Sequence, residues 1–179
     1  MLILISGCSG SGKNTVINKL MENNPNLNFL KACTSREKKE RDEGKSPYIH
    51  ITKEEFEEKI KNNELFEYEE IHGNYYGLLK ETINDVIKSD KDYIKDIGVL
   101  GQKNMTSRIG NKVKIVSIYL DVPKQELINR LKLRGETEIE KRLARFDFEN
   151  AHRPNYNLII QNNNLDKTVE IIQNIIDKR

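Results

Sequence analysis

A glycine-rich loop near the N-terminus has the residue types and the spacing needed to hold a chain of phosphates. Residues Gly7 to Lys13 read G-C-S-G-S-G-K, which matches the pattern G-x-x-x-x-G-K. Glycines let the backbone curl so that successive amides point at phosphate oxygens, and a helix that follows adds its partial positive charge. Because Lys13 would reach the β- and γ-phosphates, the loop predicts binding of a nucleoside triphosphate.

The residue after Lys13 departs from this pattern, which has Ser or Thr there as a magnesium ligand. This chain has Asn14, followed by Thr15. Mg²⁺ prefers hard oxygen ligands, and both side chains carry one. The Asn14 amide can bind the ion directly or through water, and Thr15 can replace it in part. The sequence therefore predicts a Mg²⁺ ligand at Asn14 or Thr15 and leaves the choice open.

The elements around this loop alternate between strand and helix. Leu2 to Ser6 is a continuous apolar run typical of a buried parallel strand, and the helix from Lys13 stops at Asn23-Asn24-Pro25. Further strands are expected at 29–34, 93–97, 113–120 and 158–160, and further helices at 82–89, 123–133, 139–150 and 165–176. This order predicts an α/β fold, a P-loop core with a parallel sheet and crossover helices.

The stretch from about residue 34 to 80 breaks this rhythm. It holds a charged loop, a short strand near Tyr48, a helix at 54–62 and a half-buried strand at 65–71, in which Glu69 and Glu70 are interpreted as surface. We therefore expect a single domain over 1–179, with a core at 1–33 and 81–179 and a β-rich insert at about 34–80.

The insert also carries residues suited to a phosphorylated acceptor. Thr34-Ser35-Arg36 is followed by Tyr48, by Glu67 and then by the stretch G-N-Y-Y-G at 73–77. In this arrangement the chain resembles the guanylate kinase family, which has T-T-R, a tyrosine, and an acid nine residues before the second tyrosine of G-N-Y-Y-G. The match covers essentially the whole chain, with later pieces at 127–135, 141–143 and 156–167.

The resemblance implies an acceptor site for GMP or dGMP, with ATP as donor and ADP plus GDP or dGDP as products. Cations and hydroxyls would grip the acceptor phosphate, and Glu67 would accept hydrogen bonds from guanine N1 and the amino group. Lys39 stands where the family has a second arginine, so the charge is kept and the planar fork is lost. The implied acceptor residues are Arg36, Lys39, Tyr48, Glu67, Tyr76 and Gly77.

The resemblance also implies a short helical lid at about 134–145. Arg134 and Arg142 would close over the transferred group, while Arg145, on the same helix face as Arg142, can take over its role. Asp96 ends an apolar strand and would orient the water molecules of the metal. The implied catalytic residues are Lys13, Arg36, Asp96, Arg134 and Arg142, and the implied ATP contacts are Gly7, Ser9, Gly10, Ser11, Gly12, Lys13, Asn14, Thr15 and Asn162.

Three positions depart from the family pattern near the base and phosphate. Leu78 replaces a Ser or Thr, Gly98 replaces the second acid of D-x-D, and Ala32 replaces a serine. A kinase of ribose bisphosphate is one alternative, which Glu67 argues against because that acceptor has no base. A non-catalytic domain that binds phosphopeptides is another, which the intact loop with Lys13 argues against.

Composition narrows the class of partner. The 179 residues include 30 Lys and Arg against 28 Asp and Glu, so there is no basic excess of the kind that nucleic acid or a membrane surface would require. The two cysteines form no disulfide framework, and the apolar N-terminal run is too short for a signal peptide. We expect a cytoplasmic monomer or homodimer whose partners are small nucleotides.

Overall fold

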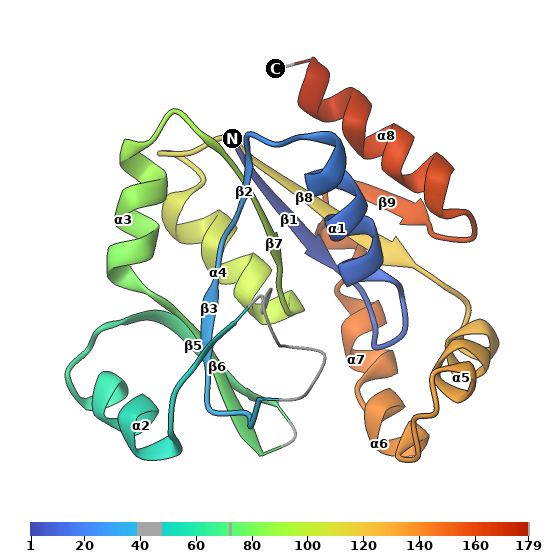
Figure 1. Cartoon of the computed structure of the whole chain (residues 1–179), viewed down its shortest axis with the longest axis horizontal. Helices are drawn as coiled ribbons and strands as arrows, with labels where there is room; N and C mark the ends of the chain where they lie inside the picture. The colour runs from blue at the N-terminus through green and yellow to red at the C-terminus, as the bar shows by residue number, and fades with distance from the viewer. Residues whose placement is uncertain (39–47, 72, 179) are drawn as a thin grey trace.

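The computed structural model describes residues 1–38, 48–71 and 73–178. Its centre is a five-stranded sheet in the order β2-β7-β1-β8-β9, in which every neighbouring pair is parallel (Figure 1). The strands are β1 (Leu2–Ser6), β2 (Leu27–Phe29), β7 (Asp92–Asp96), β8 (Ile115–Asp121) and β9 (Leu158–Gln161). The predicted parallel α/β core is confirmed.

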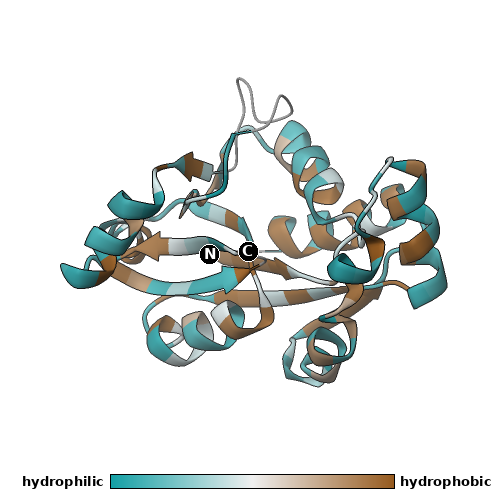
Figure 2. Cartoon of the chain, turned by 90° about the horizontal axis from the view of Figure 1, so that it is seen from below, coloured by the Kyte–Doolittle hydropathy of each residue, from teal (hydrophilic) through white to brown (hydrophobic). Residues whose placement is uncertain are grey.

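Alternation along β1 explains why both faces of this sheet are covered. Ile3 and Ile5 pack against α1 (Lys13–Asn23) and α8 (Leu165–Asp177), whereas Leu2 and Leu4 pack against the opposite layer. That layer contains α3 (Lys80–Lys88) and α4 (Val99–Ile109). Figure 2 shows the apolar strands between more hydrophilic helices. The sequence analysis missed α4, whose polar residues and glycines hide its apolar spacing.

A second sheet, in the order β4-β3-β6-β5, extends from one end of the core. Its strands are β3 (Ala32–Thr34), β4 (Tyr48–His50), β5 (Leu65–Ile71) and β6 (Asn74–Leu79). Strands β3 and β4 are parallel, and the other two pairs are antiparallel. The single strand expected at 29–34 is two strands, because the chain leaves the core sheet after Leu30 bonds to Ile94 and joins the second sheet at Ala32. The second sheet therefore begins ahead of the boundary expected at residue 34.

Helix α2 (Lys53–Lys61) packs against the second sheet. A capping box starts it: the Thr52 hydroxyl accepts from the Glu55 amide, and the Glu55 carboxylate accepts from the Thr52 amide. Its one fully buried side chain is Phe56, which stacks on Tyr75 with ring centroids 5.2 Å apart. Phe56 is thus the centre of a small core separate from the two faces of the main sheet.

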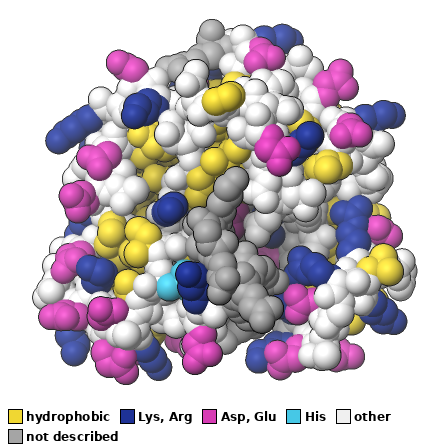
Figure 3. Space-filling model, viewed as in Figure 1, with side chains coloured by type: hydrophobic (Ala, Val, Ile, Leu, Met, Phe, Trp, Pro, Cys, Tyr) yellow, Lys and Arg dark blue, Asp and Glu magenta, His cyan; other side chains and the backbone are white. Residues whose placement is uncertain are grey.

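Three short helices lie near the carboxyl ends of the core strands, on the side opposite the second sheet (Figure 1). They are α5 (Lys124–Leu133), α6 (Ile139–Leu143) and α7 (Phe146–Ala151), and a 3-10 turn, η2 (Arg153–Asn155), leads on to β9. On the face drawn in Figure 3, cationic and anionic side chains alternate. Among the described residues, none of the helices combines the length and the apolar character needed to cross a membrane.

Removal of the Phe56 ring should weaken the fold of the second sheet. We expect Phe56→Ala to lower the free energy of unfolding by about 3–5 kcal/mol, because a fully buried aromatic ring leaves a cavity. Denaturant titration followed by circular dichroism measures this change. Leu133→Ala is the control, since that side chain is 90% exposed and should change stability little. Equal effects of the two substitutions would contradict this assignment of the core.

Candidate active site

The phosphate loop joins β1 to α1 and is packed closely against the residues behind it. Gly12, which caps α1, has φ of 90°, a left-handed conformation that favours glycine. A Cβ atom there would lie 2.7 Å from the side-chain nitrogen of Asn162, and one on Gly7 would lie 2.6 Å from the Leu120 carbonyl oxygen. The loop can therefore curl only because glycine occupies these positions. Lys13 folds across it, with Nζ 2.6 Å from the Gly7 oxygen and 3.2 Å from the Cys8 oxygen.

Asn162 supports this loop from inside the protein. Its Nδ2 donates to the Ser11 carbonyl oxygen at 2.7 Å, and its Oδ1 accepts from the Thr168 hydroxyl at 2.8 Å. Arg130 donates to the Asn162 backbone oxygen at 2.9 Å, and Asn162 is only 6% exposed. Both ends of the amide are thus engaged with protein, so Asn162 positions the loop, and a direct contact with ATP stays a prediction.

The first turn of α1 presents the two residues expected to bind a metal ion. Asn14 and Thr15 are both exposed, immediately after Lys13. The described residues include no group of three His, Cys, Asp or Glu side chains arranged to hold an ion. The side chains expected to bind the ion, Asn14 and Thr15, offer neutral oxygens, which suit Mg²⁺ that keeps water and phosphate oxygens as its other ligands. Asn14 and Thr15 fit such an ion, and the choice between them stays open.

Asp96 connects the core sheet with the second sheet. It lies at the end of β7, opposite Ile5 of β1, where it pairs with Lys95 and accepts a hydrogen bond from the Tyr48 hydroxyl at 3.0 Å. Burial alone would raise the pKa of Asp96, but the charges of Lys95 and Lys13 and the bond from Tyr48 hold it below its usual range. Asp96 is therefore an anion that is stabilised by the charges of Lys95 and Lys13 and by the hydrogen bond from Tyr48.

Lys95 is a residue of this site that sequence reasoning missed. It is only 3% exposed, and its ammonium lies 5.5 Å from the Tyr48 ring centroid and 5.1 Å from that of Phe29. The available signal was a lysine beside Ile94 within the strand expected at 93–97, since buried lysines are rare unless paired. Here the partner is Asp96, the next residue along the chain.

The second sheet brings three of the expected acceptor residues together. The Tyr48 and Tyr76 rings are 5.5 Å apart at 67°, and the Arg36 guanidinium lies 5.8 Å from the Tyr48 ring centroid. Arg36 follows β3, and its amide donates to the Thr34 hydroxyl at 3.2 Å while its carbonyl oxygen lies 2.9 Å from Nδ1 of His50. Lys39, the other cation expected here, lies outside the described residues.

Glu67 lies on β5, opposite Leu78 of β6. Burial raises the pKa of its carboxyl to about 7, with a further increase from Glu69, while Lys95 and Arg108 act in the opposite direction. A carboxylate that is difficult to keep charged gains from a ligand that donates hydrogen bonds to it.

Two expected features near Glu67 serve packing. A Cβ on Gly77 would lie 2.9 Å from both the Glu67 carbonyl oxygen and the Phe56 ring, so this glycine permits the close approach of β5, β6 and α2. Leu78 is fully buried in the core against Leu4 and Leu30. The position that the family pattern gives to a hydroxyl is here a core position.

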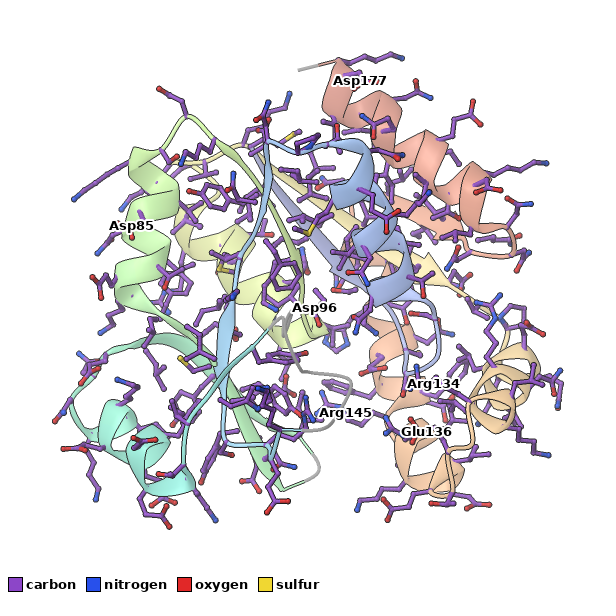
Figure 4. The ribbon with its side chains drawn as sticks, in the orientation of Figure 1. Asp85, Asp96, Arg134, Glu136, Arg145 and Asp177 are labelled. Carbon is purple, nitrogen blue, oxygen red and sulfur yellow. The ribbon has the colours of Figure 1, made fainter. Side chains whose placement is uncertain are left out.

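The lid arginines divide into two groups. Arg134 and Arg142 share the Glu136 carboxylate, at 2.9 Å and 2.7 Å, and together they hold the pKa of Glu136 below its usual range against the effect of burial. Arg145 instead reaches the second sheet, with Nη2 2.6 Å from Oε1 of Glu69. Figure 4 shows Arg134 and Glu136 at the corner between α5 and α6, with Arg145 displaced toward the second sheet. Glu69 is thus 19% exposed and paired, so its interpretation as surface was wrong.

The comparison with known sequences is consistent along the chain. The family model for guanylate kinase matches residues 1–179. A guanylate kinase of Bacteroides thetaiotaomicron is 36% identical over 99% of this chain and 90% of its own length. One of Clostridium tetani is 37% identical over 98% of this chain and 85% of its own length.

Solved structures agree on the fold. A guanylate kinase from Anaplasma phagocytophilum matches with a TM-score of 0.77 at 23% identity, covering 99% of this chain and 85% of that one. A shikimate kinase from Aquifex aeolicus, at a TM-score of 0.52 and 16% identity, covers 99% of this chain and 97% of that one. With a family model over its full length and relatives above one-third identity, the chain belongs to the guanylate kinase family.

Proposed function

We propose that this chain transfers the γ-phosphoryl group of ATP to GMP or dGMP, forming ADP and GDP or dGDP. The observation that carries the proposal is the junction at Asp96. The hydroxyl of Tyr48, which we expect to bind the acceptor, donates a hydrogen bond to this carboxylate. The charge of Lys13 in the phosphate loop also lowers the pKa of the same carboxylate. The end of β7 therefore links a residue expected to bind the acceptor with one expected to bind the donor, and the two come from different parts of the chain. Such a juxtaposition suits transfer between two bound phosphates.

The acceptor would lie along the second sheet with its phosphate toward Arg36. A guanidinium can grip a phosphate through two parallel hydrogen bonds, and the hydroxyls of Tyr48 and Tyr76, together with Lys39, would add further donors. Glu67 would receive the N1 and amino hydrogens of guanine. Tyr76 lies on β6 opposite Thr34 of β3, and Arg36 follows Thr34 by two residues. The pairing of these strands therefore sets the distance between Arg36 and Tyr76.

The donor would lie in the phosphate loop. Lys13 and the loop amides would hold the β- and γ-phosphates of ATP, and Mg²⁺ would be held by these phosphates together with Asn14 or Thr15. The metal would neutralise charge on the phosphates during transfer. Arg134 and Arg142, already side by side on Glu136, would close over the transferred group and stabilise its equatorial oxygens. Closure of the lid and insert would exclude water and so suppress hydrolysis.

The two alternatives have less support. A ribose bisphosphate has no base for the buried carboxylate of Glu67 to bind. A phosphopeptide-binding domain has no need of a complete phosphate loop, and this loop keeps Lys13 and is packed against Asn162. Membership of the guanylate kinase family over residues 1–179 favours the enzyme.

A panel of acceptors tests the reaction directly. Release of ADP would be followed in a coupled assay with ATP, Mg²⁺ and one acceptor at a time: GMP, dGMP, IMP, AMP or ribose 1,5-bisphosphate. We expect GMP and dGMP to give the highest kcat/KM, because they alone present the donor pair that Glu67 would accept. Turnover with ribose bisphosphate and none with GMP would overturn the proposal.

Arg36 is expected to act on the acceptor and not on ATP. Arg36→Ala should raise the KM for GMP by roughly 10- to 100-fold, the size expected for losing hydrogen bonds to a charged phosphate. The Kd for ATP, measured by calorimetry, should stay within about twofold of the original because the loop residues are untouched. Lys38→Ala is the matched control, since this exposed cation lies two residues away. An unchanged KM in Arg36→Ala would show that the acceptor phosphate binds elsewhere.

The raised pKa of Glu67 predicts a pH dependence. Its carboxyl titrates near 7, so the charged form, which alone accepts from both guanine donors, is lost as the pH falls through that value. We expect kcat/KM for GMP to decrease by about tenfold per unit below this pKa, in addition to the decrease from the phosphate group of GMP, which titrates near 6. Glu67→Gln should keep only the decrease that comes from GMP. Identical profiles for the two proteins would contradict the assignment.

A further inference from the structure

Two glycines at the start of α4 face two carboxylates of β5. A Cβ atom on Gly101 would lie 2.9 Å from Oε2 of Glu67, and one on Gly98 would lie 3.0 Å from Oε2 of Glu69. Glu67 and Glu69 are two residues apart on one strand, so they point to the same face of the sheet. The absence of side chains at positions 98 and 101 therefore provides the space in which both carboxylates lie.

The Glu69 carboxylate is held at one oxygen and available at the other. Oε1 accepts from Arg145 at 2.6 Å, an ion pair in which the two side chains are 19% and 26% exposed. Within the described residues no hydrogen bond reaches Oε2, the oxygen that faces Gly98. A half-buried carboxylate oxygen is stabilised when it accepts a hydrogen bond from a donor. Arg145 therefore acts as a positioning residue that leaves Oε2 available to a ligand.

Guanine offers one more hydrogen than Glu67 alone can accept. Its edge presents the N1 hydrogen and two hydrogens on the amino group. A single carboxylate accepts the N1 hydrogen and the nearer amino hydrogen in parallel, and the second amino hydrogen points away from it. That hydrogen needs another acceptor, and the carboxylate next along the same face of β5 is Glu69.

On the basis of the proposed function, we propose that Glu69 is a second specificity-determining residue, whose carboxylate accepts the outer amino hydrogen of the guanine acceptor. Its Oε2 lies 3.0 Å from the place that the Cβ atom of a residue at position 98 would take, so β5 can supply the acid that is missing from D-x-D at Gly98. Discrimination for guanine is then preserved although the second acid of D-x-D is missing at Gly98.

The test compares GMP with IMP, which lacks the amino group and is otherwise the same acceptor. Glu69→Ala should lower kcat/KM and raise the Kd for GMP by roughly 10- to 100-fold and change both values for IMP little. The double variant Glu69→Ala/Gly98→Asp should restore the preference for GMP, because its new acid takes the vacated space. Glu70→Ala is the matched control, since Glu70 is exposed on the other face of the same strand.

Each outcome decides between two interpretations. The proposal is supported if the ratio of kcat/KM for GMP to kcat/KM for IMP falls in Glu69→Ala and recovers in the double variant. An equal loss for both acceptors would overturn it and reduce Glu69 to a structural partner of Arg145. If Glu69→Ala does not fold by circular dichroism, Glu69→Gln keeps the shape and should shift the ratio in the same direction. Failure of the unsubstituted protein to phosphorylate GMP would instead refute the proposed function itself.

Discussion

The hydrogen bond between Tyr48 and Asp96 joins the two sheets at the end of β7, where we propose that donor and acceptor meet. Asp96 is a largely buried anion, and a buried charge is tolerated only when it is paired and hydrogen-bonded. Lys95 supplies a charge and a hydrogen bond, and Tyr48 adds a second hydrogen bond that requires β4 to lie against the end of β7. The position of the acceptor residues relative to the phosphate loop follows from this requirement.

Charge is divided across the site in a way that suits a nucleotide with an anionic phosphate and a hydrogen-donating base. Lys13, Arg36 and the lid arginines would surround the phosphates, while Glu67 and Glu69 face the first turn of α4. Each lid arginine has a carboxylate partner in this structure, either Glu136 or Glu69. These pairs keep the cations in place, and Arg134 and Arg142 could form the same kind of charge-assisted hydrogen bond with phosphate oxygens.

Sequence reasoning predicted the elements whose patterns are local. The apolar run of β1, the glycine loop and the helix from Lys13 follow from residue type and spacing alone. The stretch 29–34 was read as one strand because its pattern does not say which sheet each half joins. Helix α4 was missed since Gly98 precedes it and Gly101 lies in its first turn; these glycines weaken a helical pattern yet make room for carboxylates.

For the site, the residue types predict the chemistry, whereas only the folded chain shows which side chains are paired. Residue type and spacing predict the phosphate loop and an acceptor role for Arg36, Tyr48 and Tyr76, because those motifs are short or held at constant separations. Only the folded chain showed that Lys95 neutralises Asp96, and that Glu69, read as surface, fills the space left by Gly98. The partner of a side chain depends on which strand from elsewhere in the sequence lies beside it. The spacing of residues along the chain does not contain that information.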